Sequence, residues 1–228
     1  AAERVITSTT QEIEEQYGLY DHYRPEQMCV IPPGTDMERF HPPDGSEQEG
    51  EIAREIHRFF AAPQKPLILA LSRADPRKNI ATLLTAFGEH PELRNLANLV
   101  IIAGNRDDIS EMDEGTREVL TELLLLIDRY DLYGQVAIPK HHHAEDVPVI
   151  YRLAAAAHGV FINPALTEPF GLTLIEAAAS GLPVVATEDG GPRDIIGNCK
   201  NGLLVDPLDA DAMAQSLYEA GYITYMRT

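Results

Sequence analysis

The chain has 228 residues, of which 44% are hydrophobic and 24% are charged, and 36 acidic residues against 18 basic ones give a net charge of −18. This excess of acid argues against nucleic acid and anionic membranes as partners. No run of 18 apolar residues is present, so we expect no transmembrane helix, and the length suits one full domain with an appendage.

The cysteines and the first residues bear on the cellular compartment. Cys29 and Cys199 are too few for a disulfide framework, and neither lies in the spacing of a metal site. The opening AAERVITSTT lacks the basic, apolar and small-residue regions of a signal peptide. We therefore expect a cytoplasmic protein.

The first 60 residues predict small elements around a linker. Residues 32–50 are rich in proline, glycine and acidic residues, which is typical of a linker or hinge. Thr9 or Thr10 can cap the first helix. The predicted elements are strands at 5–8 and 28–31 and helices at about 10–17 and 51–60.

From Pro66 onward, six apolar strands alternate with helices, which predicts an α/β fold with a parallel sheet covered on both faces. Such a doubly wound, Rossmann-like domain binds its ligands at the carboxyl ends of the strands. No strand is followed by Gly-x-Gly-x-x-Gly, which disfavours a nicotinamide dinucleotide. Strands are predicted at 66–72, 98–104, 135–139, 159–163, 183–187 and 202–206, and helices at 79–90, 115–130, 145–157, 171–181, 193–197 and 210–221.

The central stretch of the domain is FINPALTEPFGLTLIEAAASGLP, at 161–183. A helix that begins near Gly171 offers an anion site, because its first backbone N–H groups have no partner within the helix. Glu168 precedes this site and Glu176 lies within the helix. Both could be solvated surface glutamates, but a charge in the apolar run LTLIEAAAS predicts a functional role for Glu176. The pair suits the two ends of an elongated ligand better than one scissile bond, since eight helical positions span about 12 Å.

Cations follow the first strand of the domain. Arg73, Arg77 and Lys78 lie within six positions of an otherwise acidic protein. They could form a solvated basic loop, but their place at the carboxyl end of a strand favours a phosphate clamp. Arginine suits bidentate contact with phosphate, and lysine acts as a point charge.

Three further loops lie at the same edge of the predicted sheet. Gly104 opens a loop whose two aspartates, 107 and 108, give a weak indication of Mg²⁺. Lys140 begins a run with three histidines, which we interpret as a ligand-facing loop that meets a base rather than as a metal site, because adjacent loop residues seldom converge on one ion. Gly190 and Gly191 allow either a close approach of backbone to a ligand or an ordinary turn.

Together, the motifs ALSRADPRKN, AGNRDD, LYGQVAIPKHH, the central stretch, DGGPRDI and NGLLVDP resemble the C-terminal half of the sucrose-phosphate synthase family. These enzymes are retaining GT-B glycosyltransferases of glycosyltransferase family 4. The resemblance runs from about Val5 to Tyr218. It implies transfer of glucose from UDP-glucose, or ADP-glucose, to fructose 6-phosphate, giving sucrose 6-phosphate with retention at the anomeric carbon.

The resemblance also implies roles for individual residues. Arg73 and Lys78 match the cations that hold the donor diphosphate, and Glu168 matches the carboxylate near the donor sugar; these three form the expected catalytic set. Glu176 matches the glutamate that binds ribose. The expected donor-binding residues are Gly104, Lys140, Phe170, Gly171, Leu172, Thr173 and Glu176. No essential cofactor or metal site is implied, although stimulation by Mg²⁺ is compatible with the resemblance.

The resemblance divides the chain into three parts. We expect residues 1–40 to be a remnant of the N-terminal GT-B domain plus hinge, 41–220 to be the nucleotide-sugar-binding domain, and 221–228 to be an atypical tail. The missing N-terminal domain is the expected partner, and without it the chain should bind donor weakly and complete no transfer. The alternatives are sucrose synthase or another family member, and a non-catalytic nucleotide-sugar-binding domain.

Overall fold

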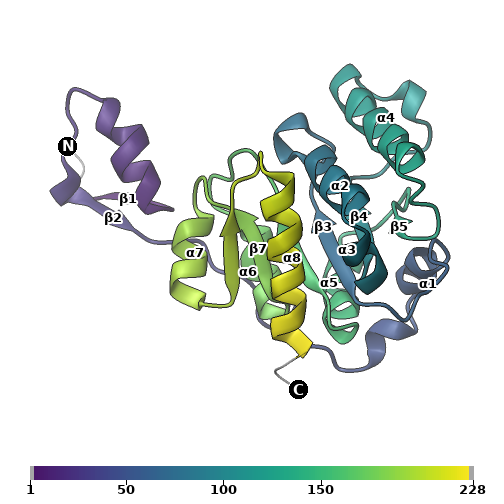
Figure 1. Ribbon diagram of the computed structural model, residues 1–228. Helices are drawn as coiled ribbons and strands as arrows, with labels where there is room; N and C mark the ends of the chain where they lie inside the picture. Colours follow the sequence, from purple (N-terminus) through teal and green to yellow (C-terminus); the bar gives the residue numbers. More distant parts are fainter. Residues whose placement is uncertain (1–2, 226–228) are drawn as a thin grey trace.

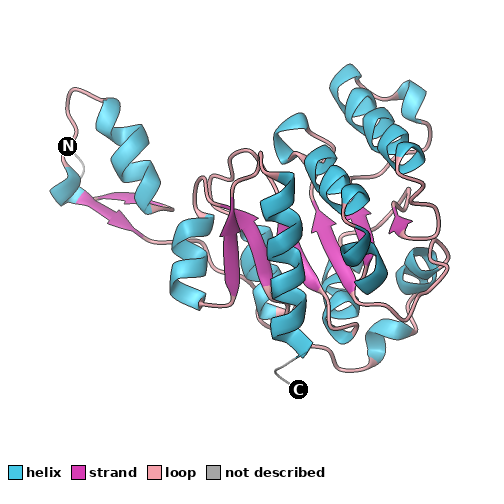
Figure 2. Ribbon diagram, viewed as in Figure 1, coloured by secondary structure: helices cyan, strands magenta, loops and turns pink. Residues whose placement is uncertain are grey.

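The computed structural model describes residues 3–225, with side chains described as far as residue 221. A parallel six-stranded sheet in the order β5-β4-β3-β6-β7-β8 forms its centre (Figures 1 and 2). This arrangement confirms the predicted doubly wound α/β fold. The strands are β3 (Leu67–Leu71), β4 (Asn98–Ile102), β5 (Val136–Ala137), β6 (Val160–Asn163), β7 (Val184–Thr187) and β8 (Gly202–Val205).

Helices cover both faces of this sheet, and each face has its own apolar core. One core packs against α2 (Ile80–Glu89), α3 (Pro91–Leu96), α4 (Glu114–Arg129) and α8 (Ala210–Tyr225). The other packs against α1 (Glu51–His57), α5 (Asp146–Ala156), α6 (Leu172–Ala179) and α7 (Pro192–Cys199). None of the helices in the described part of the chain is long and apolar enough to cross a membrane.

Alternation along β3 explains why two cores form. Ile68 and Ala70 belong to the first core, whereas Leu67 and Leu69 belong to the second. Successive strand residues point to opposite faces, so an unbroken apolar run buries both sides of the sheet. The continuous apolar strands of the sequence therefore predict the two-sided burial that is observed.

The order of the strands creates a switch point between β3 and β6. From β3 the chain winds through β4 to β5 at one edge, then returns to β6 on the other side of β3 and continues to β8. The loops that follow β3 and β6 therefore leave the sheet next to each other while their helices lie on opposite faces. In open α/β sheets this is where ligands bind.

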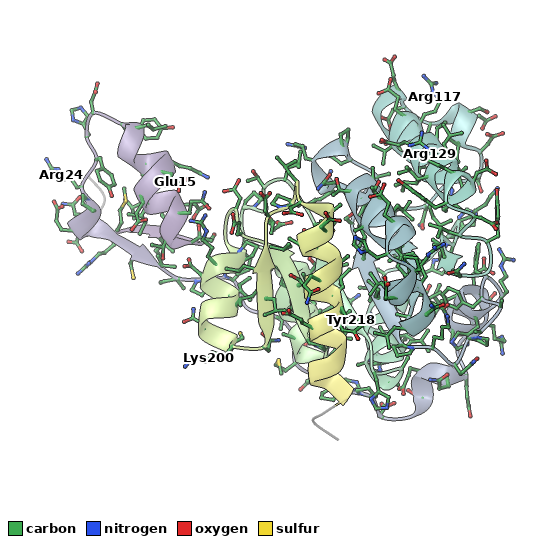
Figure 3. All side chains as sticks on the ribbon, in the orientation of Figure 1. Glu15, Arg24, Arg117, Arg129, Lys200 and Tyr218 are labelled. Carbon is green, nitrogen blue, oxygen red and sulfur yellow. The ribbon has the colours of Figure 1, made fainter. Side chains whose placement is uncertain are left out.

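The N-terminal residues form a small unit beside α7, seen at the left of Figure 1. Its strands, β1 (Val5–Thr7) and β2 (Met28–Val30), pair with each other in parallel and not with the main sheet. Figure 3 labels Glu15 and Arg24 on this unit, far from Tyr218 of α8. The backbone N–H of Thr10 donates to Asp194 of α7, at 2.8 Å.

Several local features differ in detail from those predicted. The helix expected at about 10–17 is a π-helix, Glu12–Gln16, followed by a 3-10 turn, Tyr17–Leu19. The expected linker at 32–50 contains a 3-10 turn, Ser46–Gln48, and buries Phe40 in the second core. Helix α3 was not predicted, because six residues are too few to show a helical period. The predicted capping by Thr9 is confirmed, since its hydroxyl accepts from the N–H of Glu12 at 3.2 Å.

The C-terminal tail is only partly described. Helix α8 continues to Tyr225, four residues beyond Gly221, where the tail was expected to begin. Residues 226–228 lie outside the described part of the chain.

Candidate functional site

The switch point of the sheet brings together a lysine and a glutamate from distant parts of the sequence. Lys78 Nζ lies 2.7 Å from Glu168 Oε2, and their side chains are 23% and 13% exposed. Lys78 ends the 3-10 turn that follows β3, and Glu168 lies in the loop that follows β6. Two of the three residues that were predicted to be catalytic therefore meet where ligands bind in this class of sheet.

The backbone and one asparagine hold Glu168 in place. Asn163, the last residue of β6, donates from Nδ2 to Glu168 Oε2 at 3.0 Å. The N–H of Glu168 donates to the carbonyl of Asp189 at 3.2 Å, and its carbonyl accepts from Gly191 at 3.0 Å. These bonds fix the carboxylate between the loops that follow β6 and β7.

Gly190 and Gly191 serve this packing. Gly190 has a φ of 105°, and a Cβ at this position would collide with the carbonyl of Glu168. A Cβ on Gly191 would collide with the carbonyl of Phe170. The two glycines therefore permit a close approach of backbone to the Glu168 loop, rather than forming only an ordinary turn.

Asn79 ties together the loops after three strands. It adopts a left-handed conformation with a φ of 56°. Its Nδ2 donates to the carbonyls of Pro164 and Pro207, at 3.0 and 2.7 Å, in the loops that follow β6 and β8. Since Asn79 directly follows Lys78, these bonds also set where the lysine leaves the backbone.

Helix α6 begins beside the Lys78–Glu168 pair. Gly171 has a φ of 99° and precedes the first helical residue, Leu172, and no side chain caps this end. Phe170 and Thr173 are partly buried, whereas Leu172 is 50% exposed. The first turn thus offers backbone N–H groups and the positive end of the helix dipole near Glu168.

Glu176 lies one turn further along α6 and is half-buried. The hydroxyl of Tyr151, on α5, lies 3.3 Å from Glu176 Oε2. Burial raises the pKa of Glu176, while the Tyr151 hydrogen bond and the charge of Arg39 lower it. The helix is less buried than its composition predicts, with Leu174 and Ala177 as its fully buried residues, because one face of α6 packs on the sheet.

The other predicted cations have different surroundings. Arg77 donates to both oxygens of Asp75, at 3.2 and 2.9 Å, and points into solvent. This contact, with a smaller contribution from Arg73, lowers the pKa of Asp75 to about 2. Arg73 is exposed, and it lines a pocket of about 380 Å³ together with Gly104. Of the three cations, Lys78 and Arg73 therefore lie next to sites where a ligand could bind.

The loops after β4 and β5 are bound to each other. Asn105 and the backbone of His142 form a reciprocal pair of hydrogen bonds, both 2.9 Å long. The buried guanidinium of Arg106 donates to the carbonyls of Ile138 and Pro139, at 2.9 and 3.0 Å. Lys140 donates to the carbonyl of Asp107 at 2.9 Å. The loop expected to meet a base is therefore held from one side by the β4 loop.

The candidate metal ligands remain apart. Among residues 3–225, no group of three or more His, Cys, Asp or Glu side chains is arranged to hold an ion. Asp107 pairs with His141 at 3.3 Å, and Asp108 accepts from the N–H of Ser110 at 2.8 Å. The two aspartates thus have local partners of their own.

Sequence reasoning missed Asn163, Asn79, Asn105 and Tyr151. Each has a faint signal: Asn163 is the one polar residue in the strand GVFIN, and Tyr151 is an aromatic hydroxyl in the apolar run IYRLAAAA. Buried polar groups need partners, so both residues could have been singled out. Their partners, however, depend on the order of the strands.

Comparison with known proteins identifies related chains. The family described as "Glycosyl transferases group 1" matches residues 52–220. The chain is 55% identical over 254 residues to a probable sucrose-phosphate synthase 2 of Craterostigma plantagineum, covering 95% of this chain and 24% of that protein. It is 52% identical over 257 residues to a sucrose-phosphate synthase of Zea mays, again covering 95% of this chain and 24% of that protein. The chain therefore spans about a quarter of the length of these curated relatives.

A solved structure shares the fold. The sucrose-phosphate synthase of Thermosynechococcus elongatus superimposes with a TM-score of 0.76 and 28% identity, over 99% of this chain and 50% of that one. The predicted resemblance and the predicted fold class are both confirmed.

Proposed function

The chain belongs to the group 1 glycosyl transferases, and on that premise we propose that it forms the donor-binding part of a retaining enzyme that transfers glucose from UDP-glucose to fructose 6-phosphate. The product is sucrose 6-phosphate, and ADP-glucose is the alternative donor. The named relatives support this choice of reaction, since both are sucrose-phosphate synthases by name. The proposal assigns no essential cofactor.

The observation that carries the proposal is the Lys78–Glu168 pair beside the start of α6. Lys78 and the first N–H groups of α6 supply positive charge at the switch point, where a diphosphate would lie. Glu168 adds a carboxylate next to them. A sugar diphosphate needs this combination, because its phosphates require positive partners and its sugar hydroxyls require acceptors.

The remaining donor-binding residues extend from this centre. Arg73 reaches the diphosphate from the pocket that it shares with Gly104. Glu176 accepts from the ribose hydroxyls one turn along α6, and the backbone around Lys140 meets the base. Phe170, Gly171, Leu172 and Thr173 present their backbone groups to the sugar and the phosphates.

The mechanism rests on stabilising the leaving group. The bond between the anomeric carbon of glucose and the phosphate oxygen breaks, and negative charge grows on the diphosphate. Lys78, Arg73 and the dipole of α6 stabilise that charge. The acceptor hydroxyl attacks from the face that the nucleotide leaves, its proton passes to the departing diphosphate, and the configuration is retained. No protein nucleophile is needed.

The division of the chain is part of the proposal. Residues 1–40 represent the end of an N-terminal GT-B domain and the hinge, and 41–220 are the donor-binding domain. The separate β1–β2 sheet and the single six-stranded sheet are compatible with this division. In this proposal, most acceptor contacts come from the N-terminal GT-B domain and not from these 228 residues.

Calorimetric titration of the purified chain with UDP, UDP-glucose and ADP tests donor binding. We expect UDP to bind, and we expect Glu176→Ala and Arg73→Ala to abolish or strongly weaken binding. The same titrations with and without Mg²⁺ measure any metal dependence. A folded wild-type chain that binds none of the three ligands would contradict the proposed donor site.

A second assay identifies the acceptor. When the chain is supplied within the full-length enzyme, fructose 6-phosphate and not fructose should receive glucose. Transfer to free fructose would instead indicate a sucrose synthase. Detectable sucrose 6-phosphate from the purified 228 residues alone would contradict the proposed division of the chain.

A further inference from the structure

The hydroxyl of Tyr151 is a buried polar group that the mechanism above does not use. The Tyr151 residue is fully buried on α5. Its hydroxyl lies 3.3 Å from both Glu176 Oε2 and the carbonyl of Thr173, one helical turn earlier on α6. Both distances are long for an O–H···O bond, as expected when one hydrogen lies between two acceptors.

Two aromatic rings hold the ring of Tyr151 in place. Phe161 of β6 contacts it edge-to-face at 5.5 Å and 67°, and Phe40 contacts it at 6.0 Å and 66°. Such contacts are favourable and leave a buried ring little room to turn. The hydroxyl is therefore directed at α6 by packing, before any ligand binds.

The charged and titratable groups that act on Glu176 are few. Tyr151 on α5 donates a hydrogen bond to it, and Arg39, in the segment before α1, acts through its charge. The Tyr151 bond reaches Oε2, and among the described residues no hydrogen bond reaches Oε1. One carboxylate oxygen is thus held by the protein, and the other is available to a ligand.

We propose that Tyr151 is a positioning residue that orients the Glu176 carboxylate toward the ribose hydroxyls of the bound nucleotide. Nothing in the motif of the central stretch assigns this role, since Tyr151 lies 25 positions away from Glu176. The inference rests on the proposed function. It adds that recognition of the ribose depends on a residue that does not itself touch the ligand.

The test compares UDP with 2′,3′-dideoxy-UDP in the wild-type chain and in Tyr151→Phe. This substitution keeps the ring and its packing and removes only the hydroxyl. Wild type should prefer UDP by about 10- to 100-fold, the value of one hydrogen bond to a charged group, and Tyr151→Phe should lose most of that preference. Tyr133→Phe is the matched control, because the exposed Tyr133 hydroxyl bonds to Asp128 at 2.8 Å and lies on the loop after α4.

A purely structural role would weaken both nucleotides equally, so the ratio separates the two explanations. A wild-type preference that survives intact in Tyr151→Phe would overturn the proposal for Tyr151 alone. Equal wild-type affinities would instead contradict the ribose role of Glu176, and with it this inference. In a Glu176→Gln background, Tyr151→Phe should cause no further change in the ratio.

A second measurement needs no ligand. The Tyr151 hydrogen bond stabilises the ionised carboxylate, so removing the hydroxyl should raise the pKa of Glu176, as followed by carbon NMR of its carboxyl group. Tyr133→Phe should leave that pKa where it is in wild type. An unchanged pKa in Tyr151→Phe would show that the hydroxyl does not bond to Glu176 and would overturn the proposal.

Discussion

Lys78 Nζ and Glu168 Oε2 lie 2.7 Å apart although 90 positions separate them in the sequence. The bond joins the loops that leave β3 and β6. Between these two neighbouring strands the strand order reverses, because the chain adds β4 and β5 on one side of β3 and β6 to β8 on the other. Leu166 in the β6 loop also donates its N–H to the carbonyl of Arg77, at 2.9 Å. The lysine is therefore held in position without a ligand, which is the condition for the preorganised stabilisation of charge that we propose for it.

Replacing this lysine should remove a large part of donor binding. We expect Lys78→Met to weaken UDP binding by about 10- to 100-fold, because a charge-assisted hydrogen bond to phosphate is worth about 1.5–3 kcal/mol. Glu168 would then lack its cation and would repel the diphosphate as well. Calorimetry of UDP binding measures the change.

The control lies on the same 3-10 turn. Arg77 points into solvent and bonds to Asp75, so Arg77→Met should change UDP affinity by less than about twofold. Equal losses in the two variants would mean that the overall positive charge of the loop matters and not the placement of Lys78.

Asn105 should affect the base end of the donor without affecting the phosphates. Its side chain forms two hydrogen bonds to the backbone of His142, in the loop that begins with Lys140. Asn105→Ala should release that loop and weaken UDP binding by about fivefold, the value of roughly one hydrogen bond. Binding of inorganic pyrophosphate, which has no base, should stay the same.

Ser110→Ala is the matched control for Asn105, because Ser110 is exposed in the same connection and bonds only locally, to Asp108. It should leave the binding of both ligands unchanged. If Asn105→Ala weakens UDP and pyrophosphate by the same factor, the loop acts on the whole site and the proposed base contact is wrong.

The strands and the residues of the central stretch were predictable because their signals are local. Each strand is a short apolar run bounded by turn residues. Glu168 and Glu176 lie only a few sequence positions before and after Gly171, so their place around the start of the helix can be read from the sequence. The fold follows from such runs and from their alternation with helices, since the strands of a parallel sheet are buried on both faces and read as continuous apolar runs. The predicted catalytic and donor-binding roles of the site residues, Lys78 and Glu168 included, stay predictions.

The partners of these residues were not predictable, because they depend on the order of the strands. Asn163 and Lys78 both donate to the same oxygen of Glu168, Oε2. This arrangement is possible because β6 lies beside β3 in the sheet. Phe40 lies in a stretch with the composition of a linker, yet its ring packs against Tyr151. The local sequence indicates which segments are helices, strands or linkers. The contacts of Asn163 and Phe40 instead arise from tertiary packing between distant segments.

Gly190 should be intolerant of a side chain. Its φ is 105°, and a Cβ would collide with the carbonyl of Glu168. We expect Gly190→Ala to lower the free energy of unfolding by about 1–3 kcal/mol, the usual cost of a strained backbone residue. Urea unfolding followed by circular dichroism measures this loss.

Gly197 offers the opposite case. It lies in α7, is exposed, and has open space where a Cβ would be placed. Gly197→Ala should raise the free energy of unfolding by about 0.5–1 kcal/mol through helix propensity. If Gly190→Ala were as stable as wild type, the close packing of the β7 loop on the Glu168 loop would be disproved.

Glu176 should make the folded chain less stable at neutral pH than a neutral side chain would. Burial has the largest effect on the pKa of this carboxyl group, and it raises that pKa in the folded state above the usual value for glutamate. The folded state therefore binds the proton more tightly than the unfolded state does. Wild type should gain stability from this group as the pH falls through the raised pKa, and should lose that contribution as the pH rises.

Glu176→Gln removes the charge at every pH, so the variant should be more stable than wild type at about pH 8. The difference should shrink as the pH falls and disappear well below about pH 4.3, the pKa of an unperturbed glutamate, where wild-type Glu176 is protonated in both states. Urea unfolding at several pH values measures this difference, with Glu122→Gln on the exposed side of α4 as the control.

Weaker UDP binding by the more stable variant would show that the Glu176 charge serves ligand binding at a cost in folding stability. A variant less stable than wild type at about pH 8 would mean that Tyr151 and Arg39 compensate for burial of the carboxylate.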